Sequence, residues 1–394
     1  MRKIFTTILL FSIATLGVAQ VGTLRFMHYN LLMFPDANPN KAFRLRPIVN
    51  YLQPDIISVN ELTAQSGIDS LMKYALDTSK YAPAPWIADG TLISSLFYNK
   101  QRVGILQAYY VDSNPRKTFV YRMYYKDQDF TQFPDTIKFR QFVVHLKSSQ
   151  GSDNEFQRAE QTGTIRWHIN QNVDKRNCIL AGDFNVYTSN EEAYQNLLLP
   201  GNGQFFDPID RPGNWSNNSS FSDIHTQSPR TTSFDNGVTG GMDDRFDFIM
   251  ATEDIIDGRF GMRYLPNSYT AVGNDGNHFN KSIIDSPVNN SLPDSVLQAL
   301  HLMSDHIPVM MDVEFDPSNA FNGISEIAHY SCNFTPEQLQ LSAFKKASIR
   351  SLDGKYTYEL LPKNKLPEMA EGIYFITVEF SDNRICHQKW GVIR

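Results

Sequence analysis

The sequence predicts a mixed α/β fold: a layered sandwich, in which paired strands stack face to face with helices outside them, followed by a small antiparallel β-sandwich. Two patterns lead to this prediction. Up to residue 315, many short apolar runs of strand length are interspersed with a few segments of helical spacing. Beyond Asp316 only short runs of strand length remain, and apolar and polar residues alternate within 372–378.

The composition bounds the possible functions. The chain has 394 residues, of which 41% are hydrophobic and 12% aromatic, so it can form packed cores in more than one domain. It has only three cysteines, which excludes a disulfide scaffold and a cysteine-rich zinc ribbon. The formal net charge of −6 disfavours proteins that hold nucleic acid or an acidic membrane surface by bulk positive charge.

Residues 1–19 have the pattern of an export signal. Arg2 and Lys3 precede an apolar stretch over 4–18, and small residues follow at 17–19. The stretch is short for a membrane anchor, although an uncleaved anchor or a core helix are the alternatives. We therefore expect a mature chain that starts near Gln20, has no stable membrane span, passes through the periplasm, and is secreted or held at the cell surface.

The first domain is expected over 20–317. A strand over 24–30 is followed by a helix over 42–52, whose apolar spacing ends just before Pro54. The apolar run 55–61 predicts a buried strand with an exposed polar tip. Further strands are predicted over 92–98, 102–110, 119–125 and 137–145.

The second half of this domain contains one long helix and several strands. The helix is predicted over 154–173, because residues at helical spacing recur there: Phe156, Ala159, Thr162, Ile165 and Ile169. The segment 201–243 is rich in Gly, Asn, Ser and Pro and predicts long loops. Strands are predicted over 177–181, 245–251 and 308–315.

Polar residues stand in or directly after the apolar runs of this domain. A carboxylate among apolar neighbours is unfavourable unless a cation or a hydrogen-bond network compensates it. Singly, each polar residue is explained as well by a turn or by a structural histidine. Together they supply acids, imidazoles and amides at the strand ends of one domain: Asn30, Glu61, His145, Asp183, Asn185, Asp247, Asp305 and His306.

This set has the chemistry that a metal-assisted phosphoester hydrolase requires. Hard oxygen ligands such as Glu61 and Asp305 suit Mg²⁺ or Mn²⁺, and these ions bind substrate phosphate. An aspartate orients or deprotonates the attacking water, and imidazoles stabilise or protonate the phosphate oxygens. A pair such as His306 with Asp247 fixes the tautomer of the histidine and raises its basicity.

Six short motifs resemble those of the endonuclease/exonuclease/phosphatase superfamily, the deoxyribonuclease I-like fold, across about residues 22–315. They are Met-His-Tyr-Asn at 27–30, Pro-Asp-Ile-Ile-Ser-Val-Asn-Glu at 54–61, Val-His-Leu at 144–146, Gly-Asp-Phe-Asn at 182–185, Arg-Phe-Asp-Phe-Ile at 245–249 and Ser-Asp-His-Ile-Pro-Val at 304–309. The resemblance implies a four-layer α/β/β/α sandwich and a divalent-metal-dependent phosphoric ester hydrolase.

The resemblance also implies roles for the polar residues. Glu61 would bind the metal, with Asn30 and Asp305 beside it. Asp183 would orient or activate the water and Asn185 would hold the scissile phosphate. His145, and His306 paired with Asp247, would contact the phosphate and serve charge stabilisation or proton transfer.

The sequence departs from the superfamily pattern at two places. Asn60 replaces the usual glutamine before the metal-binding Glu61, and this shorter amide is expected to loosen the surroundings of the metal. The glutamate that braces the central histidine in deoxyribonuclease I-like members is missing around 91–97. The resemblance therefore implies the proton-donor role for His306 rather than for His145.

The substrate is harder to infer than the reaction. A nuclease acting on extracellular nucleic acid is the first expectation; a phospholipase C-like or phosphomonoester hydrolase, or a catalytically inactive surface binding protein, are the alternatives. The side chains of Arg140, Lys147, Arg158 and Arg166 either line a phosphate groove or lie on a solvated surface. The loop 273–280, which contains His278, either contacts substrate or is a plain turn cluster.

The segment 322–394 is similar to the type A C-terminal sorting domain of the bacterial type IX secretion system. Strands are predicted over 347–351, 356–361, 372–380 and 386–393, and the chain ends in Lys-Trp-Gly-Val-Ile-Arg. The resemblance implies the type IX machinery as a partner; a carbohydrate- or protein-binding β-module is the alternative. Cys332 and Cys386 would pair in an oxidising compartment, whereas Cys178 is a small core residue.

Overall fold

The computed structural model describes residues 21–88, 90, 92–126, 137–171, 176–319, 329–331, 344–351, 355–361, 365, 369–379 and 385–392. The chain divides into two compact units, Met1–Ala320 and Phe321–Arg394. The expected signal segment 1–19 lies outside the described residues. Within the part that is described, no helix is long and apolar enough to cross a bilayer.

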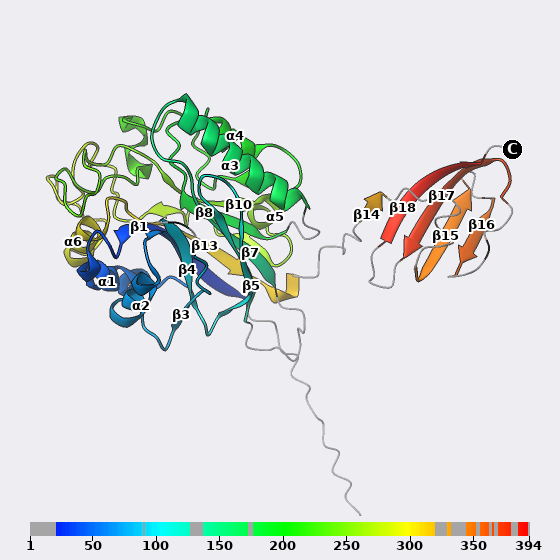
Figure 1. Ribbon diagram of the computed structural model, residues 1–394, viewed down its shortest axis with the longest axis horizontal. Coiled ribbons are helices and arrows are strands. Elements are labelled where there is room, and N and C mark those ends of the chain that lie inside the picture. Colours follow the sequence, from blue (N-terminus) through cyan, green and yellow to red (C-terminus); the bar gives the residue numbers. More distant parts are fainter. Residues whose placement is uncertain are drawn as a thin grey trace, which may run out of the picture. The chain divides into compact units, whose positions relative to one another are not determined.

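The first unit contains two stacked β-sheets with helices on both outer faces, so the predicted four-layer sandwich is confirmed (Figure 1). The first sheet has the strand order β11-β13-β1-β2-β4-β3, with β12 also paired to β13. Its strands are β1 (Gly22–Phe34), β2 (Ile56–Leu62), β3 (Tyr81–Pro83), β4 (Ile93–Asn99), β11 (Met262–Tyr264), β12 (Thr270–Ala271) and β13 (Val309–Phe315).

The second sheet has the order β5-β6-β7-β8-β10-β9. Its strands are β5 (Val103–Val111), β6 (Thr118–Tyr125), β7 (Lys138–His145), β8 (Cys178–Asp183), β9 (Phe205–Phe206) and β10 (Asp247–Thr252). Each sheet contains one parallel pair, β1 with β2 and β7 with β8. Parallel neighbours need a crossover connection, and helices α1 and α3 lie in these two connections.

Two hydrophobic clusters hold the layers together. The larger one fills the space between the sheets and extends under α1 (Ala42–Leu52), α2 (Gln65–Tyr74) and α6 (Asp294–Met303). The smaller one lies between the second sheet and the helices α3 (Ser152–Gln171) and α4 (Glu192–Leu198). Neighbouring residues on one strand enter different clusters, as Val143 and Val144 of β7 do, because side chains alternate between the two faces of a strand.

Short elements complete the first unit. The predicted loop region 201–243 is largely irregular, although it contains the two-residue strand β9 and the 3-10 helix η2 (Ser219–Ile224). The remaining short elements are η1 (Pro39–Lys41), α5 (Glu253–Ile256) and η3 (Pro317–Asn319).

The described strands of the second unit form one sheet in the order β14-β18-β17-β15-β16. These strands are β14 (His329–Ser331), β15 (Lys346–Ser351), β16 (Thr357–Leu360), β17 (Gly372–Glu379) and β18 (Ile385–Val392). They pair antiparallel as predicted, except that β14 runs parallel to β18. A second layer of the expected β-sandwich is not among the described residues, and neither Cys332 nor the side chain of Cys386 is described.

Candidate active site

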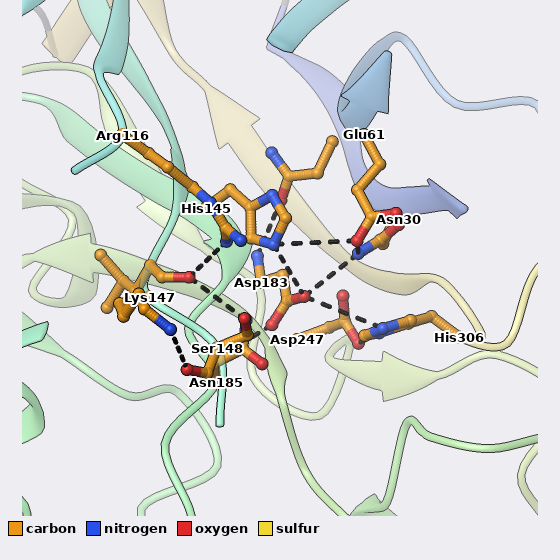
Figure 2. Close-up of polar contacts among 12 residues, drawn as sticks. Asn30, Glu61, Arg116, His145, Lys147, Ser148, Asp183, Asn185, Asp247 and His306 are labelled. Atoms are coloured by element: carbon orange, nitrogen blue, oxygen red, sulfur yellow. Dashed lines mark hydrogen bonds and ion pairs between the residues drawn. The ribbon is translucent and has the colours of Figure 1, made fainter. Parts of the chain in front are cut away.

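The carboxyl ends of the two parallel strand pairs meet at one edge of the stacked sheets (Figure 2). On the first sheet, Asn30 of β1 lies next to Asn60 of β2, and Glu61 follows. On the second sheet, His145 ends β7 in register with Asp183 at the end of β8. Strands that run parallel end on the same side of a sheet, which explains why sequence-distant polar residues gather here.

A direct hydrogen bond connects the two sheets within this group. Asn30 Nδ2 donates to Asp183 Oδ2 over 3.1 Å and also to Glu61 Oε1 over 3.0 Å. Asn60 forms a second link, because its Oδ1 accepts the Asp183 amide at 2.9 Å while its Nδ2 donates to Ser94 Oγ at 2.7 Å. The shorter amide of Asn60 therefore reaches the strand of Asp183 across the space between the sheets.

Glu61, His145 and Asp183 can offer one ligand atom each within 4.8 Å of one another. His145 Nε2 lies 3.8 Å from Glu61 Oε1 and 3.6 Å from Asp183 Oδ2. The side chain of Glu61 is 16% exposed, so the group is open to solvent on one side. Two converging carboxylates fit a hard divalent cation such as Mg²⁺ or Mn²⁺, and they repel each other unless a cation or a proton compensates them.

Asp305, the third predicted metal ligand, is not one of the three residues of this cluster. Its Oδ2 accepts the backbone amide of Val238 at 2.7 Å, and the residue is buried. Of the predicted metal-binding residues, the structure thus places Glu61 in the cluster and Asn30 in direct contact with it. A ligand role for Asp305 stays a prediction.

His306 and Asp247 lie together, as the sequence pattern predicted. His306 Nδ1 is 2.7 Å from Asp247 Oδ2, and His306 Nε2 is 3.8 Å from Asp183 Oδ2. His28 Nε2 approaches the other carboxylate oxygen of Asp247 at 3.4 Å, and Gln227 Nε2 lies 2.7 Å from His306 Nε2. Asp247 is completely buried, and two imidazoles supply the compensation that its carboxylate needs.

The charges of these residues depend on each other. Burial disfavours ionisation of Asp247, but His306 and His28 outweigh it and lower the pKa of Asp247 below its ordinary value. Burial likewise opposes an imidazolium at His306, yet Asp247 and Asp183 raise the pKa of His306 well above the ordinary value. The raised pKa favours the protonated form of His306, which Asp247 stabilises and which can donate hydrogen bonds to phosphate oxygens.

The pKa values of Asp183 and His145 are both shifted so that the neutral form of each residue is favoured. Burial, reinforced by Asp247 and Glu61, raises the pKa of Asp183 to about 7 against the opposing charge of His306. Burial, Arg116 and His306 lower the pKa of His145 well below the ordinary value. His145 Nδ1 has no hydrogen-bond partner among the residues that the structure describes, which agrees with the missing bracing glutamate.

Asn185 lies beside Asp183 with its backbone amide on Asp183 Oδ1 at 3.0 Å. Its side-chain amide reaches the Leu146 carbonyl at 3.3 Å, and Arg116 Nη1 donates to the same carbonyl at 2.7 Å (Figure 2). The Lys147 amine donates to the Ser148 carbonyl at 2.8 Å. Two cationic side chains therefore flank the site on the side of His145 and Asn185.

Sequence reasoning missed several of these neighbours. His28 stands two residues before Asn30 on the same strand. Because residues two apart on a strand point to the same face, the position of Asn30 could have indicated that His28 lies on the same side of the sheet. Arg116 and Gln227 come from loops, and no local pattern marks them. Arg158 and Arg166, expected either in a phosphate groove or on a solvated surface, are instead buried, and Arg158 pairs with Glu191 at 2.8 Å.

The loop 273–280 is held by structural contacts. His278 is buried, with Nδ1 2.7 Å from Asp275 Oδ1 and Nε2 2.9 Å from the Pro287 carbonyl. The imidazole thus ties two parts of the segment 275–287 together, which favours the turn interpretation over substrate contact.

The structure of this chain is similar to several solved structures. D. rerio TDP2 complexed with single-strand DNA product shares 16% identity, with 74% of this chain and 98% of that chain covered and a TM-score of 0.49. An endonuclease/exonuclease/phosphatase family protein from Bacteroides thetaiotaomicron shares 15% identity, with 76% and 98% covered and a TM-score of 0.48. The human Nocturnin catalytic domain with bound sulfate shares 15%, with 75% and 97% covered and a TM-score of 0.48.

Sequence comparison gives the family. No curated protein matches the chain. The model of the endonuclease/exonuclease/phosphatase family, by contrast, matches residues 27–306, a span that contains every polar residue of the site described above. The chain therefore belongs to the endonuclease/exonuclease/phosphatase family and is a metal-dependent phosphoric ester hydrolase.

Proposed function

We propose that this protein hydrolyses phosphodiester bonds in extracellular nucleic acid with the help of Mg²⁺ or Mn²⁺. The observation that carries the proposal is the convergence of Glu61, His145 and Asp183 within 4.8 Å of one another, with the His306–Asp247 pair beside them. Arg116 and Lys147 next to the cluster support a polyanionic substrate, because phosphates on both sides of the scissile bond need compensation.

In the proposed reaction the carboxylate of Glu61 would hold the divalent cation, within reach of Asp183 and His145, and the cation would neutralise charge on the phosphate. Asp183 accepts a proton from the attacking water, whose oxygen bonds to phosphorus while the P–O bond to the leaving oxygen breaks, and the leaving oxygen takes a proton from solvent. His306, kept cationic by Asp247, donates a hydrogen bond to a phosphate oxygen. Neutral His145 and the Asn185 amide bind the remaining oxygens.

The decisive experiment incubates the purified full chain with plasmid DNA, RNA, sphingomyelin, and chromogenic phosphodiester and phosphomonoester substrates, each with Mg²⁺, Mn²⁺ or EDTA. We expect metal-dependent cleavage of nucleic acid that EDTA abolishes. Exclusive cleavage of sphingomyelin or of the monoester would replace the nuclease proposal with a phospholipase C-like or a phosphomonoester hydrolase function. Loss of all five activities would instead favour an inactive binding protein.

Substitutions test the residue roles in the same assay. Asp183→Ala and His306→Ala should each reduce the rate by several orders of magnitude, because they remove groups that contact the reacting atoms. Circular dichroism should show an intact fold in both variants. Full activity in either one contradicts the role assigned to that residue.

We also propose that the protein is exported, with 1–19 removed and 322–394 recognised by the type IX secretion machinery. The sequence patterns at both ends support this, and so does the separation of Phe321–Arg394 as a unit of its own. Deletion of 321–394 should trap the protein in the periplasm, as immunoblots of cell fractions would show. Normal surface delivery of the truncated chain would leave the sorting proposal without support.

A further inference from the structure

We propose that Lys41 is a positioning residue for the metal site: it fixes a left-handed turn at Leu32 and Met33 that holds the carboxylate of Glu61 in place. The inference rests on the proposed function, since it assumes that Glu61 binds the divalent cation. It assigns a role to a buried cation that the motifs of the family do not include.

The turn connects Lys41 to Glu61 through two hydrogen bonds. Lys41 is completely buried in η1, and its Nζ donates to the Leu32 carbonyl over 2.6 Å. The next residue along the chain, Met33, donates its backbone amide to Glu61 Oε2 over 3.0 Å. Because the Leu32 carbonyl and the Met33 amide belong to one rigid peptide plane, fixing the oxygen also fixes the direction of the N–H.

The same turn holds the second contact of Glu61. The Leu32 amide donates to Asn30 Oδ1 over 3.0 Å, which fixes the side-chain amide of Asn30. Asn30 Nδ2 then donates to Glu61 Oε1 over 3.0 Å (Figure 2). Both carboxylate oxygens of Glu61 are therefore oriented by residues 30–33.

This turn is strained and needs support. Leu32 and Met33 have φ angles of 49° and 43°, and Glu61 has a φ of 61°. Bulky side chains rarely adopt this left-handed region, and such conformations persist only where the surrounding structure imposes them. The bond from Lys41 supplies that support at the peptide between the two strained residues.

A merely space-filling role does not account for a lysine here. Burial lowers the pKa of Lys41 to about 8, although Asp235 and Asp305 act in the opposite direction. Enclosing this amine is unfavourable, and an apolar side chain of the same length would fill the space without that penalty. Compared with an apolar side chain, the lysine adds one feature at this position, which is a hydrogen-bond donor for the Leu32 carbonyl.

The test measures binding of Mn²⁺ to the full-length protein by isothermal titration calorimetry. Lys41→Met keeps an unbranched apolar stem and removes the terminal amine that donates, and we expect binding to weaken by about 10- to 100-fold, as for other residues that orient metal ligands. Arg166→Met is the matched control. It removes a buried cation that donates to the Leu199 carbonyl at 2.8 Å, remote from the site, and it should leave Mn²⁺ affinity unchanged.

A second readout needs no metal. In Lys41→Met, hydrogen exchange of the peptide that contains Met33 should accelerate, because the Leu32–Met33 peptide plane is no longer fixed and the Met33 amide loses its constant direction toward Glu61 Oε2, whereas Arg166→Met should not alter it. A glycine adopts positive φ without strain, so Met33→Gly introduced into Lys41→Met should recover Mn²⁺ affinity. If Lys41→Met does not fold, Lys41→Gln replaces it, because its amide is one atom too short to reach the Leu32 carbonyl.

The outcomes separate the inference from the proposed function. Wild-type protein that binds no Mn²⁺ would overturn both. Wild-type affinity that survives unchanged in Lys41→Met or Lys41→Gln would overturn the role of Lys41 alone. Weakened binding in the Lys41 variant and in Arg166→Met alike would reduce the effect to general destabilisation and would also overturn it.

Discussion

At the scale of single residues, the site depends on groups that hold each other in defined charge states. Asp247 lies between His28 and His306, and its charge keeps His306 protonated. The pKa of Asp183, a few ångströms from His306, is raised, whereas the pKa of Asp247 is lowered. Neighbouring titratable groups with opposite pKa shifts are the arrangement in which one group accepts a proton while another donates a hydrogen bond.

Asn60 should be needed for both stability and activity. Asn60→Ala leaves the buried amide of Asp183 without its acceptor, a change that costs about 1–3 kcal/mol, and it removes a link between the sheets. We expect a lower melting temperature and a lower rate of phosphodiester hydrolysis. The control Asn99→Ala, which loses the bond to Asp55 Oδ1 (2.9 Å) far from the site, should lower only the melting temperature.

His278 should make stability depend on pH. Burial opposes its protonation, but Asp275 and the carbonyls of Asp285 and Pro287 outweigh burial and raise the pKa of His278 above its ordinary value. A raised folded-state pKa means that the stabilisation is complete below the ordinary histidine pKa of about 6.5 and is lost as the pH rises through the folded-state value. Melting curves of wild type and His278→Gln should therefore converge at higher pH. A constant difference across the titration would contradict this.

At the scale of elements, the two parallel strand pairs deliver the catalytic groups. The sequence was sufficient for this part of the fold, because long apolar runs with polar ends predict buried strands: β1, β2, β7 and β8 all lie where such runs predicted them. Helix α1 coincides with its predicted span 42–52, because apolar spacing and a following proline mark both ends.

Other elements escaped prediction for physical reasons. Strands β3, β11 and β12 have two or three residues and exist because a longer neighbour offers hydrogen bonds, which local sequence does not encode. Helix α2 contains Gly67, a weak helix former that obscures its pattern. The spacing of Val296, Leu300 and Met303 is a usable signal for helix α6, which is absent from the predicted elements.

The sequence likewise predicted only part of the candidate active site. Residues that end strands were found from their unusual polarity, as with Glu61 and Asp183. Contacts made by backbone amides and by loops, such as the Met33 amide or Gln227, depend on tertiary packing and leave no trace in a single sequence.

Gly182 should tolerate no side chain. A methyl group at this position of β8 would overlap the backbone oxygen of Val144 on β7, and neither atom can move without separating the two strands. Gly182→Ala should therefore destabilise the protein by about 1–3 kcal/mol or more, in the range of overpacked cores. Thermal unfolding measures this effect. Gly163→Ala, on the open side of α3, provides the comparison and should leave the melting temperature unchanged or raise it.

At the scale of the whole molecule, all residues of the candidate active site lie in the first unit. The second unit has a small hydrophobic cluster of its own, around Ile349 and Ile376. The two units therefore have separate cores, and we expect the chemistry to need only the first of them.

A chain truncated to residues 20–320 should hydrolyse the chromogenic phosphodiester as fast per molecule as the full-length protein. Initial rates at equal molar concentration, in the same Mg²⁺ buffer, are the measurement. A large loss of rate in a truncated protein that still shows native circular dichroism would mean that the second unit contributes to the reaction.

The residues of the candidate active site come from both of the stacked sheets and meet at the boundary between them. Asn30 and Glu61 belong to one sheet and His145, Asp183 and Asp247 to the other, and hydrogen bonds from the side-chain amides of Asn30 and Asn60 join the two sheets at this edge. A slide of one sheet over the other by the length of a single bond would disassemble the centre while leaving every strand intact. With mild heating or low denaturant concentrations, the rate of hydrolysis should therefore fall well before the secondary structure is lost. The rate of hydrolysis is then a sensitive measure of how the two sheets are aligned.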